Sequence, residues 1–490
     1  MHFGKDAKLL ALIMLFVGIL MLIPLGVSVH FDESQAIKAF LTTIALITVI
    51  SGSTLIITRK ENMRGLMPRD GYLFVTLTWV IATAFGAIPL VLSGDFTSYS
   101  SAYFEIMSGF TTTGATSLTN IEACNKGILF WRSMTNWLGG MGIVVLFVAL
   151  LPAIDAGTQI GAGSFLLLGA ESVGPVKGKL TPKTRSTAGV LWLIYVGISA
   201  MQTMLLLAGG LGLYDAVTIT FSTISAAGFS VKNASIGAYD SAYVDAVVTA
   251  FMLAGGINFS LYYKAFTGKI RQVFKDGELR WYLAIWFSCA ALGAVQLTAK
   301  HVYPTLLKSF RYTAFNVASI LTTTGFSTTD YLLWPTFSVM LIVLTMFVGG
   351  CAGSTGGGIK VIRVSTVCKM GTTLIRHRIH PNAVYKIKNG NEIMHSETLT
   401  SIVSFCAVYI ITWILGSVII ALTGTDIETC LSSTLLTLGN IGIGFGKTGP
   451  TGNFAFFPEW AKCVFSFLML AGRLELFTVY VLFSRAFWKR

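Results

Sequence analysis

Long apolar runs recur along the whole chain and restrict the folds that it can adopt. Most of them approach the ~20 residues that a helix needs to cross the hydrocarbon core of a bilayer. The runs are Leu9–Val29, Ala39–Ile57, Tyr72–Leu92, Phe130–Leu151, Val190–Leu211, Val244–Tyr263, Trp281–Leu297, Phe337–Val348, Leu399–Leu422 and Trp460–Leu482. With a mean hydropathy of +0.72 and only 12% charged residues, the chain is too apolar for a soluble domain. The sequence therefore predicts a multi-pass helical membrane protein, and its first run is too long for the apolar part of a cleaved signal.

The net charge of +13 is distributed unevenly among the connections between these runs. Alternate connections are basic, and those between them are acidic or mixed. The basic sets are Arg59, Lys60, Arg64 and Arg69; Lys177, Lys179, Lys183 and Arg185; Lys264, Lys269, Arg271, Lys275 and Arg280; Lys360, Arg363, Lys369, Arg376, Arg378, Lys386 and Lys388; and Arg485, Lys489 and Arg490. The positive-inside rule places these sets and the N-terminus in the cytoplasm. Because the basic groups are spread over several loops without a binding module, no nucleic-acid partner is expected.

Four successive units of the chain each contain two spans, and a surplus segment lies between the two spans of each unit. Each segment has a short amphipathic stretch and then a glycine-containing core, and a second glycine-containing landmark follows. The cores are Thr112-Thr113-Gly114, Ala226-Ala227-Gly228, Thr323-Thr324-Gly325 and Asn440-Ile441-Gly442, and the landmarks are WLGGMG (137–142), LAGGIN (253–258), FVGGCAGSTGGG (347–358) and LAGRLE (470–475). Two landmarks that recur four times in the same order indicate an internal fourfold repeat.

The four cores have a composition that suits a site for a monovalent cation. Irregular backbone at membrane depth is tolerated where protein buries it or where it lines a water-filled cavity. Four such segments around one axis would present rings of carbonyl oxygens in place of an ion's hydration shell, and glycine permits the backbone angles required. None of the cores carries a carboxylate, which would favour divalent ions. A single core would be an ordinary re-entrant turn, with Asp215 and Asp426 as helix caps, but four in register favour a selectivity filter.

The predicted fold is an all-α polytopic membrane protein with an N-terminal helix hairpin and four repeats. Each repeat consists of a helix, a pore helix, a filter core and a second helix, and the four surround a central pore with pseudo-fourfold symmetry. The predicted divisions are residues 1–66 for the hairpin and 67–172, 173–272, 273–390 and 391–490 for pore repeats 1 to 4.

The third repeat departs from this pattern in its second span. Its apolar run Phe337–Val348 covers only about half a membrane, and six glycines follow within ten residues. Because glycine costs up to ~1 kcal/mol per residue inside a helix, an unwound loop facing the cavity below the filter is predicted. The candidate gate residues are Gly349, Gly350, Gly353, Ser354, Thr355, Gly356, Gly357 and Gly358. A glycine patch for close helix packing is the alternative.

Several charged residues outside the basic sets are further candidates. Arg473 lies near the middle of the last run, where a charge costs at least ~2.5 kcal/mol, so it should face protein or water. A structural pair with Glu475 or another buried acid is the alternative, although residues two apart on a helix do not face each other well. Glu105 and Glu122 flank the first core and would either concentrate cations at the outer mouth or be solvated surface acids. The basic stretch RHRIHP (376–381) would contact an acidic regulatory subunit or anionic lipid headgroups, or would only reflect topology.

The chain resembles the Trk/Ktr/HKT family of potassium transporters, and most closely its bacterial TrkH/TrkG branch. The likeness covers nearly the whole chain. It rests on the extra hairpin, the four cores, WLGGMG, AESVGPVKGKLTPKTRSTAGVLWLIY (170–195), GGCAGSTGGGIKVIR (349–363) and AGRLELFT (471–478). The middle of residues 149–175 departs from the usual sequence of this branch.

The resemblance implies K⁺ uptake down its electrochemical gradient across the bacterial cytoplasmic (inner) membrane. It implies a homodimer with one pore per subunit, and a cytosolic TrkA-like ring of nucleotide-binding regulatory subunits. K⁺ would bind at the twelve core residues, and the glycine-rich loop would be a mobile gate. Arg473 would hold this loop by hydrogen bonds to carbonyls and repel cations in the closed state. Relatives with a serine in the first repeat also pass Na⁺, so Gly114 implies a preference for K⁺.

Two other classes of protein compete with this interpretation. A potassium symporter coupled to H⁺ or Na⁺ is the first, although such transporters usually show inverted repeats and ionisable residues at the midplane. An enzyme is not expected, because the sequence lacks H-E-x-x-H, G-x-S-x-G and P-loop motifs. No organic cofactor is predicted, so control by nucleotides would need a partner chain. The seven cysteines form no C-x-x-C pair and are expected to be packing residues.

Overall fold

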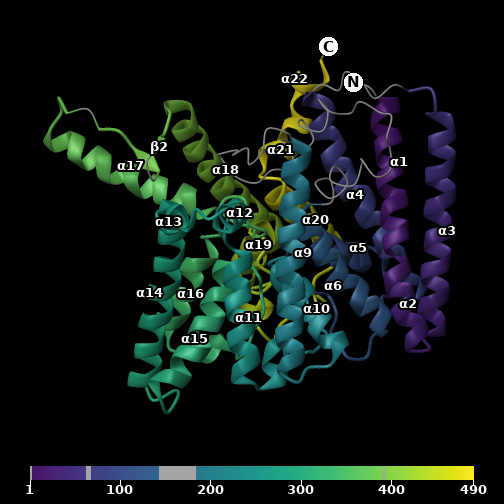
Figure 1. The fold of residues 1–490 in the computed structure, drawn as a ribbon, viewed down its shortest axis with the longest axis horizontal. Helices are drawn as coiled ribbons and strands as arrows, with labels where there is room; N and C mark the ends of the chain where they lie inside the picture. Colours follow the sequence, from purple (N-terminus) through teal and green to yellow (C-terminus); the bar gives the residue numbers. More distant parts are fainter. Residues whose placement is uncertain (1–2, 62–67, 143–183, 384, 390–391, 490) are drawn as a thin grey trace.

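The protein is built almost wholly of helices. The computed structural model describes residues 3–61, 68–142, 184–383, 385–389 and 392–489. Six of the described helices are long and apolar enough to cross a membrane, and two bent helix pairs would raise the number of spans to eight. The long helices lie roughly side by side, and both termini are at the same end of the molecule (Figure 1).

The N-terminal hairpin stands at one edge of the molecule (Figure 1, purple). Its first arm consists of α1 (Phe3–Leu20) and α2 (Leu22–His30), which together make one span, and α3 (Ser34–Ile57) returns beside it. At the turn, the carboxylate of Glu33 accepts hydrogen bonds from the amides of Lys126 and Gly127, the latter at 3.0 Å. The hairpin is therefore attached to the start of the second helix of the first repeat.

Four units follow the hairpin, each with a long first helix, a short pore helix and a second helix. In chain order they are α4 (Pro68–Leu92), α5 (Tyr99–Phe110) and α6 (Lys126–Gly140); α9 (Thr184–Ala208), α10 (Leu213–Ile224) and α11 (Ala242–Gly255); α14 (Gly277–Ala299), α15 (Leu306–Leu321) and α16 (Thr336–Met346); and α18 (Ser396–Ala421), α19 (Ile427–Leu438) and α20 (Glu459–Arg473). The four pore helices all end in the interior, where their last residues are fully buried. The predicted fold class is thus confirmed.

Polar side chains set the start of most pore helices. Three of these helices begin after a side chain that accepts a hydrogen bond from the amide three residues later, namely Ser98, Thr305 and Asp426. Hydrogen bonds from the hydroxyl and amide of Thr429 also hold the pKa of Asp426 below its ordinary value. Helix α10 differs, because it begins after Gly212 without a side-chain cap. The predicted cap role of Asp215 is therefore wrong, although its carboxylate lies in the first turn, near the positive end of the helix dipole.

The second helix is interrupted in more repeats than the sequence predicted. In the second repeat, α11 ends at Gly255 and α12 (Phe259–Phe266) continues at 95°. In the fourth, α20 ends at Arg473 and the chain continues through α21 (Phe477–Tyr480) at 111°. The expected continuous spans Val244–Tyr263 and Trp460–Leu482 are therefore wrong. Hydropathy does not reveal these bends, because both sides of each break are apolar.

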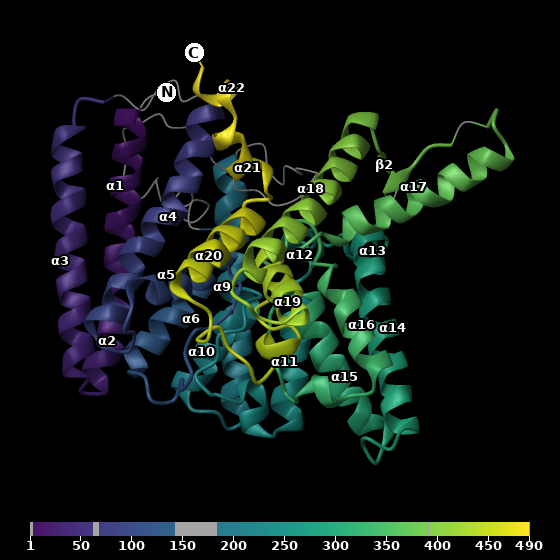
Figure 2. The ribbon, with the colours of Figure 1, turned by 180° about the vertical axis from the view of Figure 1, so that it is seen from behind.

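The remaining elements are short. They are α13 (Ile270–Phe274), α22 (Arg485–Trp488), the 3₁₀ turns η1 (Ser235–Tyr239), η2 (Tyr331–Leu333), η3 (Gly446–Thr448) and η4 (Val481–Phe483), and strands β1 (Lys388–Asn389) and β2 (Glu392–Ile393). The two strands pair antiparallel, with Lys388 opposite Ile393. Together with α17 (Val361–Ile379) they project sideways at the end of the molecule that carries the termini (Figure 2). The basic residue Arg64, the set Lys177–Lys183 and the segment 149–175 lie outside the described residues.

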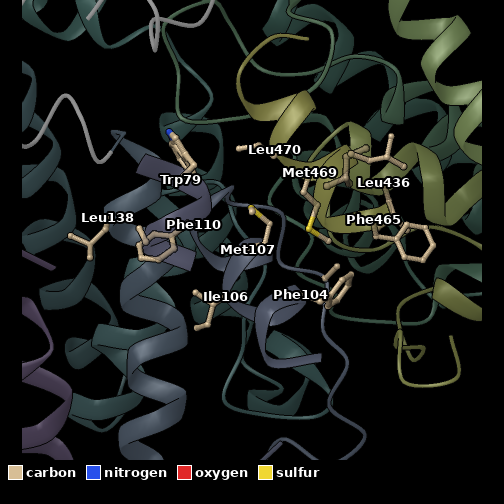
Figure 3. Packing of buried hydrophobic residues seen from close by; sticks show 14 of the residues in the cluster. Trp79, Phe104, Ile106, Met107, Phe110, Leu138, Leu436, Phe465, Met469 and Leu470 are labelled. Atoms are coloured by element: carbon tan, nitrogen blue, oxygen red, sulfur yellow. The ribbon is translucent and has the colours of Figure 1, made fainter. Parts of the chain in front are cut away.

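The four repeats form a closed ring through contacts between neighbours. The first and fourth repeats meet where Phe104 and Met107 of α5 face Phe465 and Met469 of α20 (Figure 3). The first and second are joined by a hydrogen bond from Asn136 to Ser222, and the third and fourth by one from Tyr331 to the carbonyl of Gly444. Buried side chains of α11 and α15 join the second and third, among them Val248, Met252, Phe315 and Ala318. This closure brings the four pore helices together.

Candidate ion-conducting site

Each pore helix ends in the same hydrogen-bonded turn. In the first repeat, the amide of Thr112 donates to the carbonyl of Gly109 at 2.9 Å, and that of Thr113 donates to Ser108 at 2.8 Å. The bonds equivalent to the second of these run from Ala227 to Ser222 at 2.8 Å, from Thr324 to Ser319 at 2.8 Å and from Ile441 to Leu436 at 2.9 Å. This is the Schellman arrangement, which satisfies the last carbonyls of a helix and turns the chain sharply. It places every core directly at the carboxyl end of its pore helix.

One non-glycine residue in each core has a left-handed backbone conformation. The residues are Thr112, Ala226, Thr323 and Asn440, with φ of 55°, 56°, 61° and 53°. Glycine or asparagine usually occupies this position of the turn, because a Cβ atom is disfavoured there. Three of the four residues are therefore strained, at a cost on the order of 1–3 kcal/mol each. Sequence reasoning did not identify this strain, since only Asn440 is a residue type that suggests it.

The key glycines of the four cores touch one another in a ring. A Cβ atom on any of them would lie closer than 3.0 Å to main-chain atoms of the next repeat. The contacts run from Gly114 to Gly228, from Gly228 to Thr324 and Gly325, from Gly325 to Ile441, and from Gly442 back to Thr113. Gly114, Gly325 and Gly442 also have φ of 79°, 81° and 90°, whereas Gly228 does not have positive φ. Close approach of neighbouring main chains is common to all four glycines, so it is a stronger reason for glycine at this position than the φ angle.

The main-chain carbonyls of the cores have no other hydrogen-bonding role. Among the described residues, no N–H or O–H group donates to the carbonyl oxygens of the twelve core residues. Two of the core side chains bond to each other: the hydroxyl of Thr113 accepts from the side-chain nitrogen of Asn440 at 2.9 Å, and it also shares a 2.9 Å bond with the hydroxyl of Thr111. Uncharged carbonyl oxygens without other partners are suitable ligands for a monovalent cation.

Residues 347–360 form a non-helical loop directly against the cores. The amide of Gly357 donates to the hydroxyl of Thr323 at 2.7 Å, and the hydroxyl of Thr355 donates to the carbonyl of Ile224, at the end of α10, at 2.9 Å. A Cβ atom on Gly357 would lie 2.8 Å from the side chain of Asn440. The loop therefore contacts cores or pore-helix ends from three repeats, and its glycines allow the chains to approach closely.

Arg473 joins this loop to the first repeat. Its guanidinium donates to the carbonyl of Thr355 at 2.7 Å and to those of Gly139 and Gly140, at the end of α6, at 2.6 and 2.9 Å. The residue is 6% exposed. One side chain from the fourth repeat thus binds both the third repeat and the first repeat. The carboxylate of Glu475 pairs with Arg363 at 2.5 Å.

Two residues of the basic sets assigned to the cytoplasm are buried beside the loop. Lys360 is 0% exposed and donates to the carbonyl of Gly356, and Arg363 is 4% exposed and stacks on Phe405 at 3.8 Å. Their burial was not predicted, because a basic residue just after an apolar run is expected in a loop whether or not protein covers it.

Glu278 was missed altogether by sequence reasoning. It is 6% exposed at the start of α14, and its Oε1 atom accepts hydrogen bonds from the amides of Ala352 at 2.7 Å and Ile362 at 3.1 Å. The first amide lies within the loop and the second lies at the start of α17 just after it, so one carboxylate holds both segments. Asp276 and Glu278 are both acids within the basic stretch of residues 264–280, and nothing in that stretch singles out Glu278 for this role.

We expect Glu278→Gln to loosen the loop and leave the filter intact. A neutral amide accepts weaker hydrogen bonds than a carboxylate, and losing roughly 1–2 kcal/mol should lower the melting temperature by about 2–4 °C. With the loop as the gate that the sequence predicts, basal cation flux in proteoliposomes should rise and the ratio of K⁺ to Na⁺ flux should not change. The control Glu397→Gln changes an exposed acid in the first turn of α18 and should alter neither quantity. A changed ion ratio in Glu278→Gln would contradict the expectation.

The two acids flanking the first core differ from one another. Glu122 is exposed, as both interpretations of this residue required. Glu105 is 0% exposed and pairs with Arg132 at 2.6 Å, so it is neither a solvated surface acid nor a residue of the outer mouth. Both interpretations of Glu105 are therefore wrong. The sequence did not reveal the burial, because the partner Arg132 lies 27 positions away on another helix.

Fold and site together define a multi-pass α-helical transport protein with four internal repeats around one axis. Residues 36–490 match the TrkH family, described as cation transport protein. The chain is 36% identical over 492 residues to the Trk system potassium uptake protein TrkH of Escherichia coli (strain K12), covering all of both chains. It is 33% identical over 478 residues to TrkG of the same strain, covering 96% of this chain and 95% of the relative.

The structure agrees with this sequence relationship. The crystal structure of the potassium transporter TrkH from Vibrio parahaemolyticus matches with a TM-score of 0.88 at 31% identity, over all of both chains. The chain belongs to the TrkH family of cation transport proteins. It is a transport protein and not an enzyme.

Proposed function

We propose that the chain is a potassium uptake pore whose ion path passes through the ring of Gly114, Gly228, Gly325 and Gly442. The observation that carries the proposal is the closure of this ring by backbone contacts from each repeat to the next. The named function of the relatives, potassium uptake, supports the choice of ion.

The twelve core residues bind K⁺ through their carbonyl oxygens in this proposal. Four pore helices point their carboxyl ends at the cores, and the partial negative charge of these ends favours a cation. The cores carry no formal charge, so a monovalent ion is not held too strongly to move on. The strained turns keep the carbonyls in place before the ion arrives.

The loop of residues 349–358 is the gate in this proposal. Its contacts with three repeats block the path below the cores, and Arg473 holds it there while its positive charge repels cations. Opening would require the loop to leave the carbonyl-bound guanidinium and the carboxylate of Glu278.

The same proposal covers assembly and location. The chain would form a homodimer with one pore per subunit in the bacterial cytoplasmic membrane, and a cytosolic TrkA-like nucleotide-binding ring would regulate it. The termini and α17 lie toward one end of the molecule, which we assign to the cytoplasm because basic residues gather there (Figures 1 and 2). The exposed stretch 376–381 lies at the end of α17, where a regulatory subunit or anionic lipids would bind. The repeat boundaries given above belong to this proposal.

A flux assay with four cations tests the function. Purified protein in liposomes should pass K⁺ and Rb⁺ faster than Na⁺ and Li⁺, because rings of carbonyls at fixed spacing suit the larger ions. Equal passage of all four would contradict a selective filter. Reversal potentials measured under imposed H⁺ and Na⁺ gradients should follow the K⁺ gradient alone; a shift with either gradient would indicate a symporter instead.

A further inference from the structure

A buried ion pair stands directly behind the filter core of the first repeat. Glu105 lies in α5 and Arg132 in α6, and their side chains are 0% and 1% exposed. Nε and one terminal nitrogen of the guanidinium both donate to Oε1 of the carboxylate, at 2.9 and 2.6 Å. Two charges are stable in such a place only when further hydrogen bonds satisfy their remaining atoms.

Those further hydrogen bonds hold the chain that leaves the core. Oε2 of Glu105 accepts from the amide of Ser117 at 2.8 Å and from its hydroxyl at 3.2 Å, and Oε1 accepts from the hydroxyl of Thr116 at 2.7 Å. Arg132 also donates to Thr116, at 3.3 Å. Since these residues follow Gly114 closely, the pair ties the outward end of the core to the pore helix behind it.

The residues equivalent to Glu105 in the other repeats indicate the role of this position. Glu105 precedes its key glycine by nine residues, and the equivalent residues are Ile219, Asn316 and Ser433. Asn316 makes a similar but neutral tether, donating to the hydroxyls of Thr328 and Thr329 at 3.3 and 3.4 Å. Tethering the outgoing chain to the pore helix is therefore a feature that two repeats share by different chemistry.

The second repeat has no such tether, because Ile219 carries no polar group. It is braced from the first repeat instead. The guanidinium of Arg132 lies over the ring of Phe229, the residue after Gly228, at 4.1 Å. Cation–π contact of this kind is stabilising, and more so when it is desolvated. One ion pair therefore supports two adjacent quarters of the ring.

We propose that Glu105 and Arg132 are positioning residues that set the placement of the first and second cores, and with it the discrimination between K⁺ and Na⁺. This inference rests on the filter function proposed above. The pair is neutral as a whole, so it acts on the ion through the backbone that it holds and not through net charge.

The test compares ion ratios, which do not depend on how much protein is folded. Glu105→Gln keeps the shape of the side chain and removes its charge. In proteoliposomes, the ratio of Rb⁺ to Na⁺ uptake should fall at least about tenfold, the size expected for losing one charge-assisted hydrogen bond. Because this variant leaves Arg132 buried without its counter-charge, its yield will also fall.

A double variant separates folding from positioning. Glu105→Gln with Arg132→Met leaves no unpaired charge, so its yield and melting temperature should recover. Its ion ratio should stay low, since neither the carboxylate on Ser117 nor the guanidinium on Phe229 is present. The matched control is Asp245→Asn, which removes the carboxylate of another largely buried pair, with Arg311 at 2.7 Å, away from the cores. Its ion ratio should equal that of the unmodified protein.

The outcomes are distinct. Unchanged ion ratios in both Glu105 variants overturn the positioning role, and so does an equal fall in Asp245→Asn. An unmodified protein that passes Rb⁺ and Na⁺ equally overturns the proposed filter itself, and the role of the pair with it.

Discussion

Replacing Gly325 by alanine is expected to reduce K⁺ transport at least roughly 100-fold, because the new Cβ atom meets two separate penalties. The residue has φ of 81°, a conformation that alanine adopts only with strain. The Cβ atom would also overlap the carbonyl oxygen of Ile441 in the next repeat, and that carbonyl cannot move without moving its own core. The change would be measured as Rb⁺ uptake by proteoliposomes that contain equal amounts of folded protein.

A matched glycine elsewhere controls for the substitution itself. Gly197 lies on α9, and a Cβ atom there would have no neighbour within 4 Å. Gly197→Ala should therefore transport at the normal rate and be as stable as the unmodified protein or slightly more so. Near-normal Rb⁺ uptake in Gly325→Ala would show that ions do not pass through the glycine ring.

Removing Arg473 is expected to raise basal K⁺ flux at least about tenfold. Its hydrogen bonds to Thr355, Gly139 and Gly140 hold the loop against the pore. Hydrogen bonds to a charged group contribute roughly 1.5–3 kcal/mol each. Losing even one of them should therefore lower the equilibrium constant that favours the closed over the open state by about a factor of ten. Arg473→Ala should therefore leak K⁺ in liposomes without any activating ligand, and its ion ratio should stay normal.

Arg473→Lys separates geometry from charge. Lysine keeps the positive charge but lacks the planar fork that reaches carbonyls on two sides. If the hydrogen bonds hold the loop, Lys and Ala variants should both leak; if repulsion of cations dominates, only Ala should. Unaltered flux and gating in Arg473→Ala would remove this residue from the gate.

Some of the fold could be predicted because its signals are local. A span needs an apolar run of sufficient length, and the internal repeat was predicted from two landmarks that recur four times in the same order. Bends were harder to predict: the break after Gly255 depends on the side chain of Asn258, which accepts from the amide of Ser260 at 2.9 Å, and on Cys351, whose amide donates to Gly256 at 2.8 Å. The second of these bonds joins two different repeats, and no local pattern contains it.

The candidate site likewise contains residues that could be predicted from local sequence and residues that could not. The twelve core residues were named from alignment of the repeats, since each core carries its own composition and spacing. The burial of Lys360 and Arg363 was not predicted, and Glu278 was missed, because the sequence does not show which distant groups surround a charged residue. Burial of a charge depends on counter-charges and donors from distant segments, which the sequence does not order in space.

The sequence by itself determined a multi-pass helical protein, its fourfold repeat and the uncharged glycine cores, because each follows from local composition and spacing. The tertiary structure decided that the cores meet in a ring, that Arg473 joins three repeats, and that Glu105 is buried. These features depend on contacts such as those of Gly442 with Thr113 and of Arg473 with Gly139, whose partners are more than 300 positions apart. Only packing of the four repeats around one axis brings such residues together.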